Sequence, residues 1–243
     1  MLDNNHYPME YDIIDHCNLN CKNCSHFSQF KSPNEKSIEE FESDLSVLCK
    51  KLPITEFKIL GGEPLLHSNI LGILRTARKI LGNSCRILMF TNGIKLNSIS
   101  NSFFLGLKLY NVEIGIARYP INVKYDEIEN KLRLFRVTYH FNEVSTFHEV
   151  TDPLGTQNPE VSFGLCRKAC ESQCYDGKFI YSCAYIQNIP LINEKFGYKI
   201  EQEKISISES RENIDKYLNS PCITCKYCNV FKPRLPWERH KYI

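Results

Sequence analysis

The sequence has no long hydrophobic segment. Nowhere do about eighteen apolar residues follow one another, which is the length that a bilayer-spanning helix needs. The first twelve residues, MLDNNHYPMEYD, also lack the positively charged start and the apolar stretch of a secretory signal. We therefore expect a cytoplasmic protein that does not bind membranes.

An excess of charge of one sign is missing as well. The chain carries 30 Lys and Arg against 28 Asp and Glu, which is a net charge of +2 in 243 residues. Domains that bind nucleic acid usually carry a clear basic excess, so we expect no nucleic-acid partner. Apolar residues at 42% and charged residues at 24% are the values of an ordinary globular protein with a sizeable core.

Cysteine, in contrast, is abundant. The chain has twelve cysteines, which in a reducing compartment are more often metal ligands than disulfides. Three of them, Cys17, Cys21 and Cys24, are spaced C-x3-C-x2-C. Three thiolates on a short loop can hold three irons of a [4Fe-4S] cluster and leave the fourth iron open to a small molecule. The alternative is a zinc loop, with His16 or His26 as the fourth ligand.

A second motif follows some forty residues later. The run Phe57 to Leu60 leads into Gly61, Gly62, Glu63 and Pro64. Glycines allow the backbone to approach a ligand closely, and a carboxylate pairs with a cation. This turn therefore has the composition of a binding site for a small cationic group.

The two motifs resemble those of the radical S-adenosylmethionine (radical SAM) enzymes. The resemblance implies that the three cysteines bind a [4Fe-4S] cluster, that SAM chelates the remaining iron, and that Gly61, Gly62 and Glu63 contact the methionyl ammonium. It also implies an electron donor such as flavodoxin or ferredoxin. The family usually has an aromatic residue against the adenine just before the third cysteine. Asn23 stands there in this chain, so we expect His26 or Phe27 to provide that face.

Strand and helix signals alternate through the first 140 residues. Ser37 is a predicted N-cap with Glu40 three residues on, at the start of an apolar helical face. Strands are predicted at 9–15, 56–60, 86–90, 112–117 and 136–141, and helices at 37–52, 69–81, 98–109 and 123–135. Such alternation is typical of parallel βαβ units and an α/β fold. The resemblance implies a partial (β/α)6 TIM-like barrel.

Parallel β/α folds bind ligands at the carboxyl ends of their strands. The cysteine loop, the GGEP turn, Asn92 in a Thr-Asn-Gly turn and Arg118 all follow predicted strands. Asn92 and Arg118 are therefore candidate SAM contacts, and Arg118 could pair with the SAM carboxylate. The alternatives are that Asn92 is only a good turn residue and that Arg118 is an exposed surface arginine.

After about residue 150 the alternation fades, and the turn-rich stretch TDPLGTQNPE predicts a boundary between domains at 1–150 and 151–243. Beyond it lie seven cysteines: Cys166, Cys170, Cys174, Cys183, Cys222, Cys225 and Cys228. Asp176-Gly177 is a strong hairpin turn signal. With these two residues in the turn, Tyr175 pairs with Lys178, and Cys170 lies opposite Cys183.

This region resembles the twitch domain, a shortened form of the SPASM domain, and implies one auxiliary [4Fe-4S] cluster. Hairpin geometry favours Cys170 beside Cys183, whereas family spacing favours Cys166. Cys222 and Cys225 are the expected remaining ligands. Cys174 and Cys228 are left over: either one of them is a spare ligand or a hydrogen-atom donor, or neither has a role. A zinc ribbon is the alternative.

These inferences predict a radical SAM oxidoreductase or epimerase. The expected substrate is a small polar molecule: a sugar, an aminosugar or a nucleotide-linked carbohydrate. We see no module for gripping a leader peptide in the sixteen residues before the cluster motif. The alternatives are modification of a ribosomally made peptide and, from another class, a non-enzymatic iron-sulfur or zinc-binding interaction protein. Tyr119, His140, Glu143 and His148 lie near predicted strand ends, but nothing in the sequence marks them as catalytic.

Overall fold

The computed structural model describes residues 7–149, 151–169, 173–229 and 232–240. Its centre is an eight-stranded sheet in the order β5-β4-β3-β2-β1-β7-β8-β9. The strands are β1 (Tyr7–Asp12), β2 (Ile54–Leu60), β3 (Arg86–Thr91), β4 (Val112–Arg118), β5 (Tyr139–Glu143), β7 (Gln173–Tyr175), β8 (Phe179–Tyr181) and β9 (Ile205–Ser206). Strands β1 to β5 are parallel, β7 joins β1 in parallel, and β8 and β9 are antiparallel. The predicted α/β class with a parallel sheet is confirmed.

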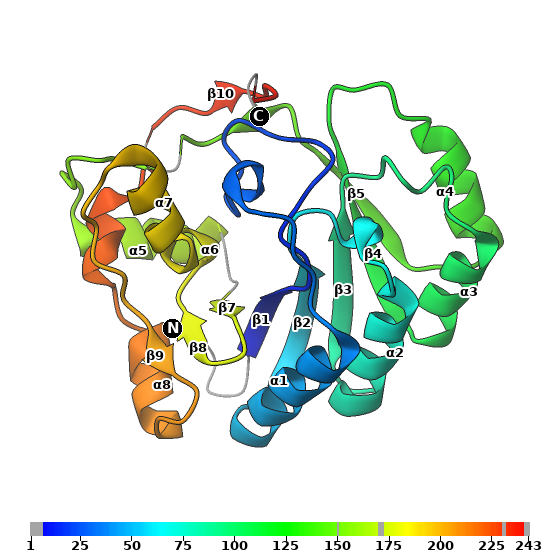
Figure 1. Cartoon of the computed structure of the whole chain (residues 1–243), viewed down its shortest axis with the longest axis horizontal. Helices are drawn as coiled ribbons and strands as arrows, with labels where there is room; N and C mark the ends of the chain where they lie inside the picture. The colour runs from blue at the N-terminus through cyan, green and yellow to red at the C-terminus, as the bar shows by residue number, and fades with distance from the viewer. Residues whose placement is uncertain (1–6, 150, 170–172, 230–231, 241–243) are drawn as a thin grey trace.

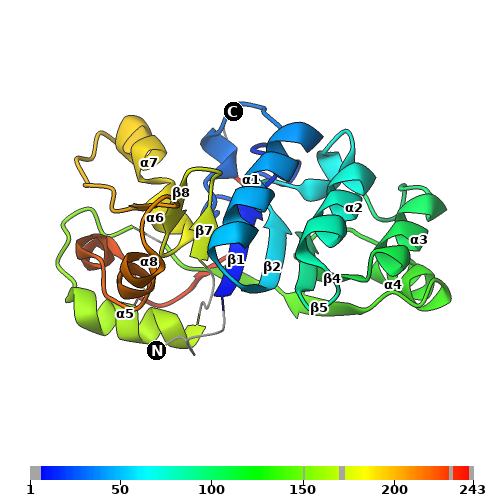
Figure 2. The ribbon, with the colours of Figure 1, turned by 90° about the horizontal axis from the view of Figure 1, so that it is seen from below.

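Four helices cover one side of this sheet (Figures 1 and 2). They are α1 (Ile38–Lys51), α2 (Ile70–Leu81), α3 (Asn101–Leu109) and α4 (Tyr125–Leu134). Because successive side chains of a strand point to opposite faces, Met9 and Tyr11 are buried under the helices, with Tyr11 5.5 Å from the Phe41 ring. Glu10 and Asp12 point to the other face. The main core therefore lies between the sheet and these four helices.

The later part of the chain adds a smaller core. The helices of this part of the chain are α5 (Pro159–Ala169), α6 (Ala184–Gln187), α7 (Ile189–Phe196), α8 (Arg211–Leu218) and the 3-10 helix η3 (Ile223–Tyr227). Tyr185, Ile189 and Ile192 are buried in this second core, where Phe27 of the cysteine loop joins them. Strands β7 to β9 nevertheless continue the main sheet. The division of the chain at residue 150 stays a prediction.

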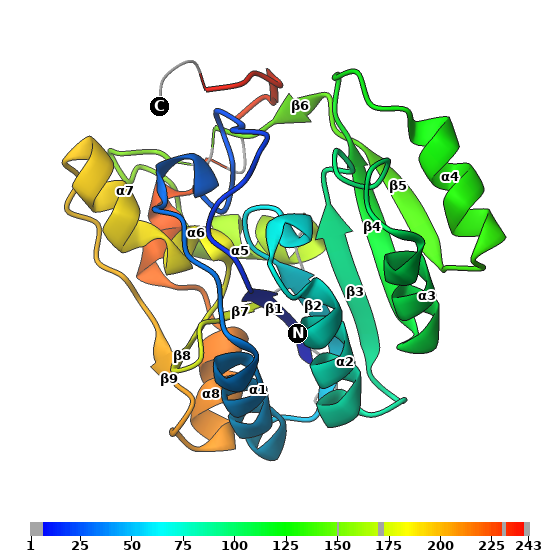
Figure 3. The same cartoon turned by 45° about the vertical axis from the view of Figure 1, so that its right-hand side comes forward.

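A two-stranded ribbon links the last residues to the middle of the chain. Strand β10 (Leu235–Pro236) pairs with β6 (Thr146–Phe147) in antiparallel fashion. In Figures 1 and 3 this C-terminal segment, in red, lies next to the cysteine loop, in blue. Residues more than 200 positions apart in the sequence are thus neighbours at the carboxyl end of β1.

The predicted register of the late hairpin is wrong. Tyr175 pairs with Ile180 and Cys174 with Tyr181, so the turn residues are Gly177 and Lys178 rather than Asp176 and Gly177. The Asp176 carboxylate accepts the backbone N–H groups of Lys178 and Phe179, and Gly177 takes a φ of 102°. A turn with glycine first is also a good hairpin turn. Cys170 lies outside the described residues, and the register does not place it opposite Cys183.

From the absence of a long apolar run, we expect no helix that spans a membrane. In the described part of the chain, no helix combines the length and the apolar character needed to cross a bilayer.

The N-cap of α1 provides a test of the fold. The Ser37 hydroxyl accepts the Glu40 N–H at 3.1 Å, and the Glu40 carboxylate accepts the Ser37 N–H at 2.9 Å, which is the predicted capping box. We expect Ser37→Ala to lower the free energy of unfolding by about 1 kcal/mol, and Tm by about 2–4 °C, in thermal unfolding. Ser100→Ala is the matched control, because Ser100 is the N-cap of α3 without a capping hydrogen bond. An equal loss in both variants would contradict this explanation.

Candidate functional site

The cysteine loop and the carboxyl ends of three strands enclose one cavity of about 150 Å³. Cys17, Cys21 and Cys24 line it. The opposite wall is formed by the ends of β2, β3 and β4, with Gly61, Gly62, Glu63, Thr91, Asn92 and Ala117. The predicted cysteine and glycine motifs, 37 or more residues apart in the sequence, therefore meet around a single space.

The three thiols lie close enough to influence one another's ionisation. Burial, together with the smaller effect of the charge of Cys24, raises the pKa of Cys17 to about 11 and that of Cys21 to about 12. The Leu19 N–H opposes this effect at Cys17, and the Trp237 side chain opposes it at Cys21. A donor set of three thiols facing one cavity fits a group that binds thiolates. Binding such a group would displace the three protons.

The two glycines bring the cysteine loop against the end of β2. The Gly62 N–H donates to the Ile14 carbonyl at 2.7 Å, and the Glu63 N–H donates to the His16 carbonyl at 3.0 Å. A Cβ at Gly62 would lie 1.9 Å from the His16 oxygen, and one at Gly61 would lie 2.1 Å from the Ile14 oxygen. No side chain fits in these contacts. The two glycines therefore allow two stretches of backbone to pack directly on each other. The sequence alone predicts only that they contact a ligand.

Glu63 is buried and joins two strand ends. Its carboxylate accepts the Thr91 hydroxyl at 2.6 Å, the Asn92 N–H at 2.8 Å and the Leu65 N–H at 3.1 Å. Burial raises the pKa of this carboxyl group, and the three hydrogen bonds oppose the rise. The side chain therefore fixes the turn after β3 relative to the turn after β2.

Asn92 faces the cysteine loop. Its side-chain amide donates to the Asn18 Oδ1 at 2.8 Å and lies 3.7 Å from the Cys17 sulfur. Its own Oδ1 accepts the Ile94 N–H at 3.0 Å. The side chain thus has a fixed orientation in the cavity where the sequence analysis expected it.

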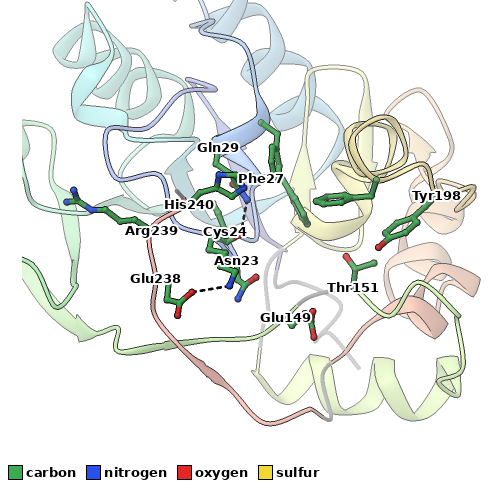
Figure 4. Close-up of a pocket in the computed structure, with 13 residues that line it drawn as sticks. Asn23, Cys24, Phe27, Gln29, Glu149, Thr151, Tyr198, Glu238, Arg239 and His240 are labelled. Atoms are coloured by element: carbon green, nitrogen blue, oxygen red, sulfur yellow. Dashed lines mark hydrogen bonds and ion pairs between the residues drawn. The ribbon is translucent and has the colours of Figure 1, made fainter. Parts of the chain in front are cut away.

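Two predicted contacts lie elsewhere. Arg118 does not line the cavity: its guanidinium lies 3.8 Å from the centre of the Phe141 ring and pairs with Glu143 at 3.3 Å. It occupies the outer position of β4, because Ala117, its neighbour, takes the inner one. Phe27 points into the second core and packs against Tyr185 at 6.4 Å. It lines a second cavity on the other side of the loop, as Figure 4 shows. His26, the alternative to Phe27, lines the first cavity.

His26 belongs to a buried charged group at the end of β1. It lies 3.1 Å from the Asp12 carboxylate, which Lys31 approaches within 3.4 Å. Burial alone would lower the pKa of His26, but the charge of Asp12 outweighs this effect and raises the pKa to about 9. Burial likewise opposes the ionisation of Asp12, whose pKa the two cations nevertheless hold below its usual value. This group ties the cysteine loop to the strand that precedes it.

Three aromatic residues meet at the site, and nothing in the sequence indicates that they do. Tyr119 and Phe147 line the cavity, with their rings stacked 6.2 Å apart. The Trp237 ring lies 5.6 Å from Tyr119, and its indole N–H donates to the Cys21 sulfur at 3.1 Å. Tyr119 had been noted only for its place near a strand end. No local pattern links it to a tryptophan 118 residues later.

The late cysteines form a second group. The charges of Cys228 and Cys222 act on Cys183, and Cys222 shares a hydrogen bond with Cys225. That bond lowers the pKa of Cys222 to about 7 and raises the pKa of Cys225. Cys166 lies half-buried on α5, which packs against η3. Cys174 instead faces Glu10, 3.5 Å from its carboxylate.

The alternatives to the clusters, a zinc loop and a zinc ribbon, would each require several side chains to bind one metal ion. Among the residues that the structure describes, no three His, Cys, Asp or Glu side chains converge closely enough to share one metal ion.

Comparison with known proteins identifies a family. The sequence profile of the radical SAM superfamily matches residues 11–180, which is more than half of the chain. A GTP 3',8-cyclase from Thermodesulfovibrio yellowstonii is 26% identical over 226 residues, covering 88% of this chain and 66% of that protein. A probable GTP 3',8-cyclase from Methanococcus aeolicus is 31% identical over 126 residues, covering 51% and 38%. The chain thus spans between 31% and 66% of the length of the first curated relatives it matches.

A solved structure shares the fold. BtrN in complex with AdoMet and 2-DOIA aligns with a TM-score of 0.56 at 13% identity, covering 93% of this chain and 92% of that chain. The parallel sheet and the late strands are thus found together in another protein of similar extent.

The close contact at Gly62 gives a test of the site. We expect Gly62→Ala to lower the free energy of unfolding by at least about 2 kcal/mol, because its Cβ would force the backbone of His16 and Cys17 to move. Chemical denaturation measures the loss. Gly164→Ala is the matched control: nothing lies within 4 Å of its added Cβ, and an alanine in a helix gains about 0.5–1 kcal/mol over glycine. A Gly62→Ala variant as stable as the parent would contradict the contact.

Proposed function

Since this chain belongs to the radical SAM superfamily, we propose that Cys17, Cys21 and Cys24 hold a [4Fe-4S] cluster whose fourth iron binds SAM. The observation that carries this proposal is the convergence of the three thiols, the Gly61-Gly62-Glu63 turn and Asn92 on one cavity. When bound and reduced, the cluster supplies the electron that splits SAM into methionine and a 5'-deoxyadenosyl radical, which takes a hydrogen atom from the substrate. The electron would come from a donor such as flavodoxin or ferredoxin.

The residues around the cavity have distinct parts in this proposal. Gly61 and Gly62 hold the loop close and offer backbone atoms to the methionyl group. Glu63 orients the Asn92 turn, and a carboxylate has room for a further hydrogen bond after accepting three. Tyr119 and Phe147 cover the side of the cavity away from the strand ends and reduce the access of water. Arg118 and Phe27 do not line this cavity, and their predicted contacts with SAM stay predictions.

We infer a small polar substrate from the relatives. The GTP 3',8-cyclases among them support a nucleotide, and a sugar, an aminosugar or a nucleotide-linked carbohydrate belongs to the same chemical class. The inner face of the sheet also carries ion pairs, but these lie toward the amino ends of the strands and do not line the cavity. The pairs are Lys58–Glu56 at 3.3 Å, and Arg86–Glu56, Arg86–Glu113 and His140–Glu113 at 2.8 Å each.

We propose the late cysteines as ligands of one auxiliary [4Fe-4S] cluster, in a domain of the twitch type. The electrostatic influence of Cys222 and Cys228 on Cys183, and the contact of Cys222 with Cys225, favour these four as the ligands. Cys166 remains an alternative on the neighbouring helix. Such a cluster could accept the second electron of an oxidation, so an oxidoreductase or epimerase reaction remains our proposal for the chemistry.

Iron counting and SAM cleavage test the proposal together. After anaerobic reconstitution we expect about eight irons per chain in the parent and about four in the triple variant Cys17→Ala, Cys21→Ala, Cys24→Ala. The triple variant should form no 5'-deoxyadenosine from SAM under reducing conditions. Cys183→Ala should lower the iron count to about four but leave the SAM-binding cluster in place. Cys49→Ala is the matched control, because Cys49 is a partly buried residue of α1 that packs against the main core and lines neither cysteine site.

The outcomes separate the candidate functions. Equal iron in the parent and the triple variant would overturn the assignment of the first three cysteines. A cluster without 5'-deoxyadenosine would favour an interaction protein. Stimulation of SAM turnover by GTP, by an aminosugar or by a nucleotide-linked sugar would identify the substrate class, and stimulation by a peptide alone would overturn the small-molecule proposal.

A further inference from the structure

We propose that Trp237 is a positioning residue that sets the reduction potential of the cluster held by Cys17, Cys21 and Cys24, through its indole N–H. This inference rests on the proposed function, because it requires a cluster at those cysteines. It assigns to the C-terminal segment, which lies outside the matched family region at 11–180, a role at the reacting centre.

The contact is direct and sheltered. The Trp237 Nε1 lies 3.1 Å from the Cys21 sulfur, and Cys21 is only 8% exposed. The Tyr119 ring packs 5.6 Å from the indole ring. The hydrogen bond from the indole to the Cys21 sulfur thus lies in a sheltered place.

The backbone holds the indole in this place from both sides. The Trp237 N–H donates to the Ser145 carbonyl at 2.9 Å, directly after the pairing of β10 with β6. The next residues run antiparallel to the cysteine loop: the Lys22 N–H donates to the Glu238 carbonyl at 2.9 Å, and the His240 N–H donates to the Asn20 carbonyl at 2.7 Å. Between these two hydrogen bonds, Cys21 and Arg239 pair as an antiparallel β-bridge.

Side chains strengthen the same contact. Lys22 and Glu238 form an ion pair at 3.0 Å, and the Asn20 amide donates to the His240 carbonyl at 3.2 Å. Figure 4 shows Glu238, Arg239 and His240 beside Asn23 and Cys24 of the loop. Because the segment is paired along its length, the indole has little freedom to leave the sulfur. A donor fixed in this way is typical of the outer groups that tune a metal centre.

The direction of the effect follows from charge. Reduction adds one negative charge to a cluster, and part of it resides on the thiolate sulfurs. A hydrogen bond from N–H to sulfur stabilises the reduced form more than the oxidised form, so it raises the reduction potential. A higher potential allows a weaker donor to reduce the cluster. Loss of the N–H should therefore make the centre harder to reduce.

A purely structural role would give a different result. The indole also packs against Tyr119, and this packing alone could hold the loop. The chain contains a single tryptophan, so growth on 3-benzothienylalanine replaces Trp237 alone with a ring of nearly the same shape that lacks the N–H. Trp237→Phe is the genetic counterpart. The double variant Lys22→Ala, Glu238→Ala is the matched control, because it removes this ion pair without changing the net charge beside the cluster or removing a donor to sulfur.

The experiment is a redox titration of the reconstituted protein, followed by electron paramagnetic resonance. The signal that changes on addition of SAM identifies the first cluster and separates it from an auxiliary one. We expect the midpoint potential of this signal to shift to more negative values in the benzothienylalanine protein and in Trp237→Phe. Iron content should stay at the parental value, and the charge-neutral double variant Lys22→Ala, Glu238→Ala should keep the parental potential.

Each other outcome is decisive. An unchanged potential with iron retained would overturn the inference and leave the proposed function intact. Loss of iron from the benzothienylalanine protein would also overturn it, because the N–H would then serve assembly rather than the potential. A shift of equal size in the double variant Lys22→Ala, Glu238→Ala would overturn the inference by assigning the effect to the placement of the loop. An iron count in the triple cysteine variant equal to that of the parent would instead overturn the proposed function.

Discussion

The site depends on one close contact between two stretches of backbone. The turn after β2 touches the chain that leaves β1, with two hydrogen bonds and no room for a side chain at Gly61 or Gly62. This contact extends the pairing of β1 and β2 beyond their last residues. It therefore sets the direction in which the cysteine loop leaves the sheet, and with it the side of the loop that faces the strand ends.

The remaining supports act on a loop that is already oriented. Asp12 fixes His26 and Lys31 behind the loop, and Glu63 connects the ends of β2 and β3 from below it. These are buried charged groups with partners, which cost much to break and so restrict the loop to one arrangement. The C-terminal segment completes the enclosure from above (Figure 3). A cofactor site of this kind needs rigid walls, because the position of the reacting atom decides which substrate hydrogen is within reach.

The limits of sequence reasoning are seen best at individual residues. The capping box of Ser37 and Glu40 was predictable because it lies within four residues, and Asn92 because a strand end defines its place. The position of Arg118 outside the cavity could not be read from the sequence, because side chains alternate along a strand and a one-residue difference moves a side chain to the opposite face. The direction of Phe27 toward the second core could not be read either, because no motif encodes its positive φ of 53°. The hairpin moved by one residue because both Asp-Gly and Gly-Lys form acceptable turns, and the bonds of Asp176 chose between them.

The sequence by itself determined the donor atoms, the glycines and the alternation of strands with helices, because each of these is a property of neighbouring residues. Only the tertiary structure decided which donors share a space. It turned Cys174 toward Glu10 and placed Trp237 on Cys21 across 216 positions of chain. The physical reason is that spacing restricts the reach of a segment but not its direction. Direction depends on packing and pairing between segments, and these arise only when the whole chain is folded.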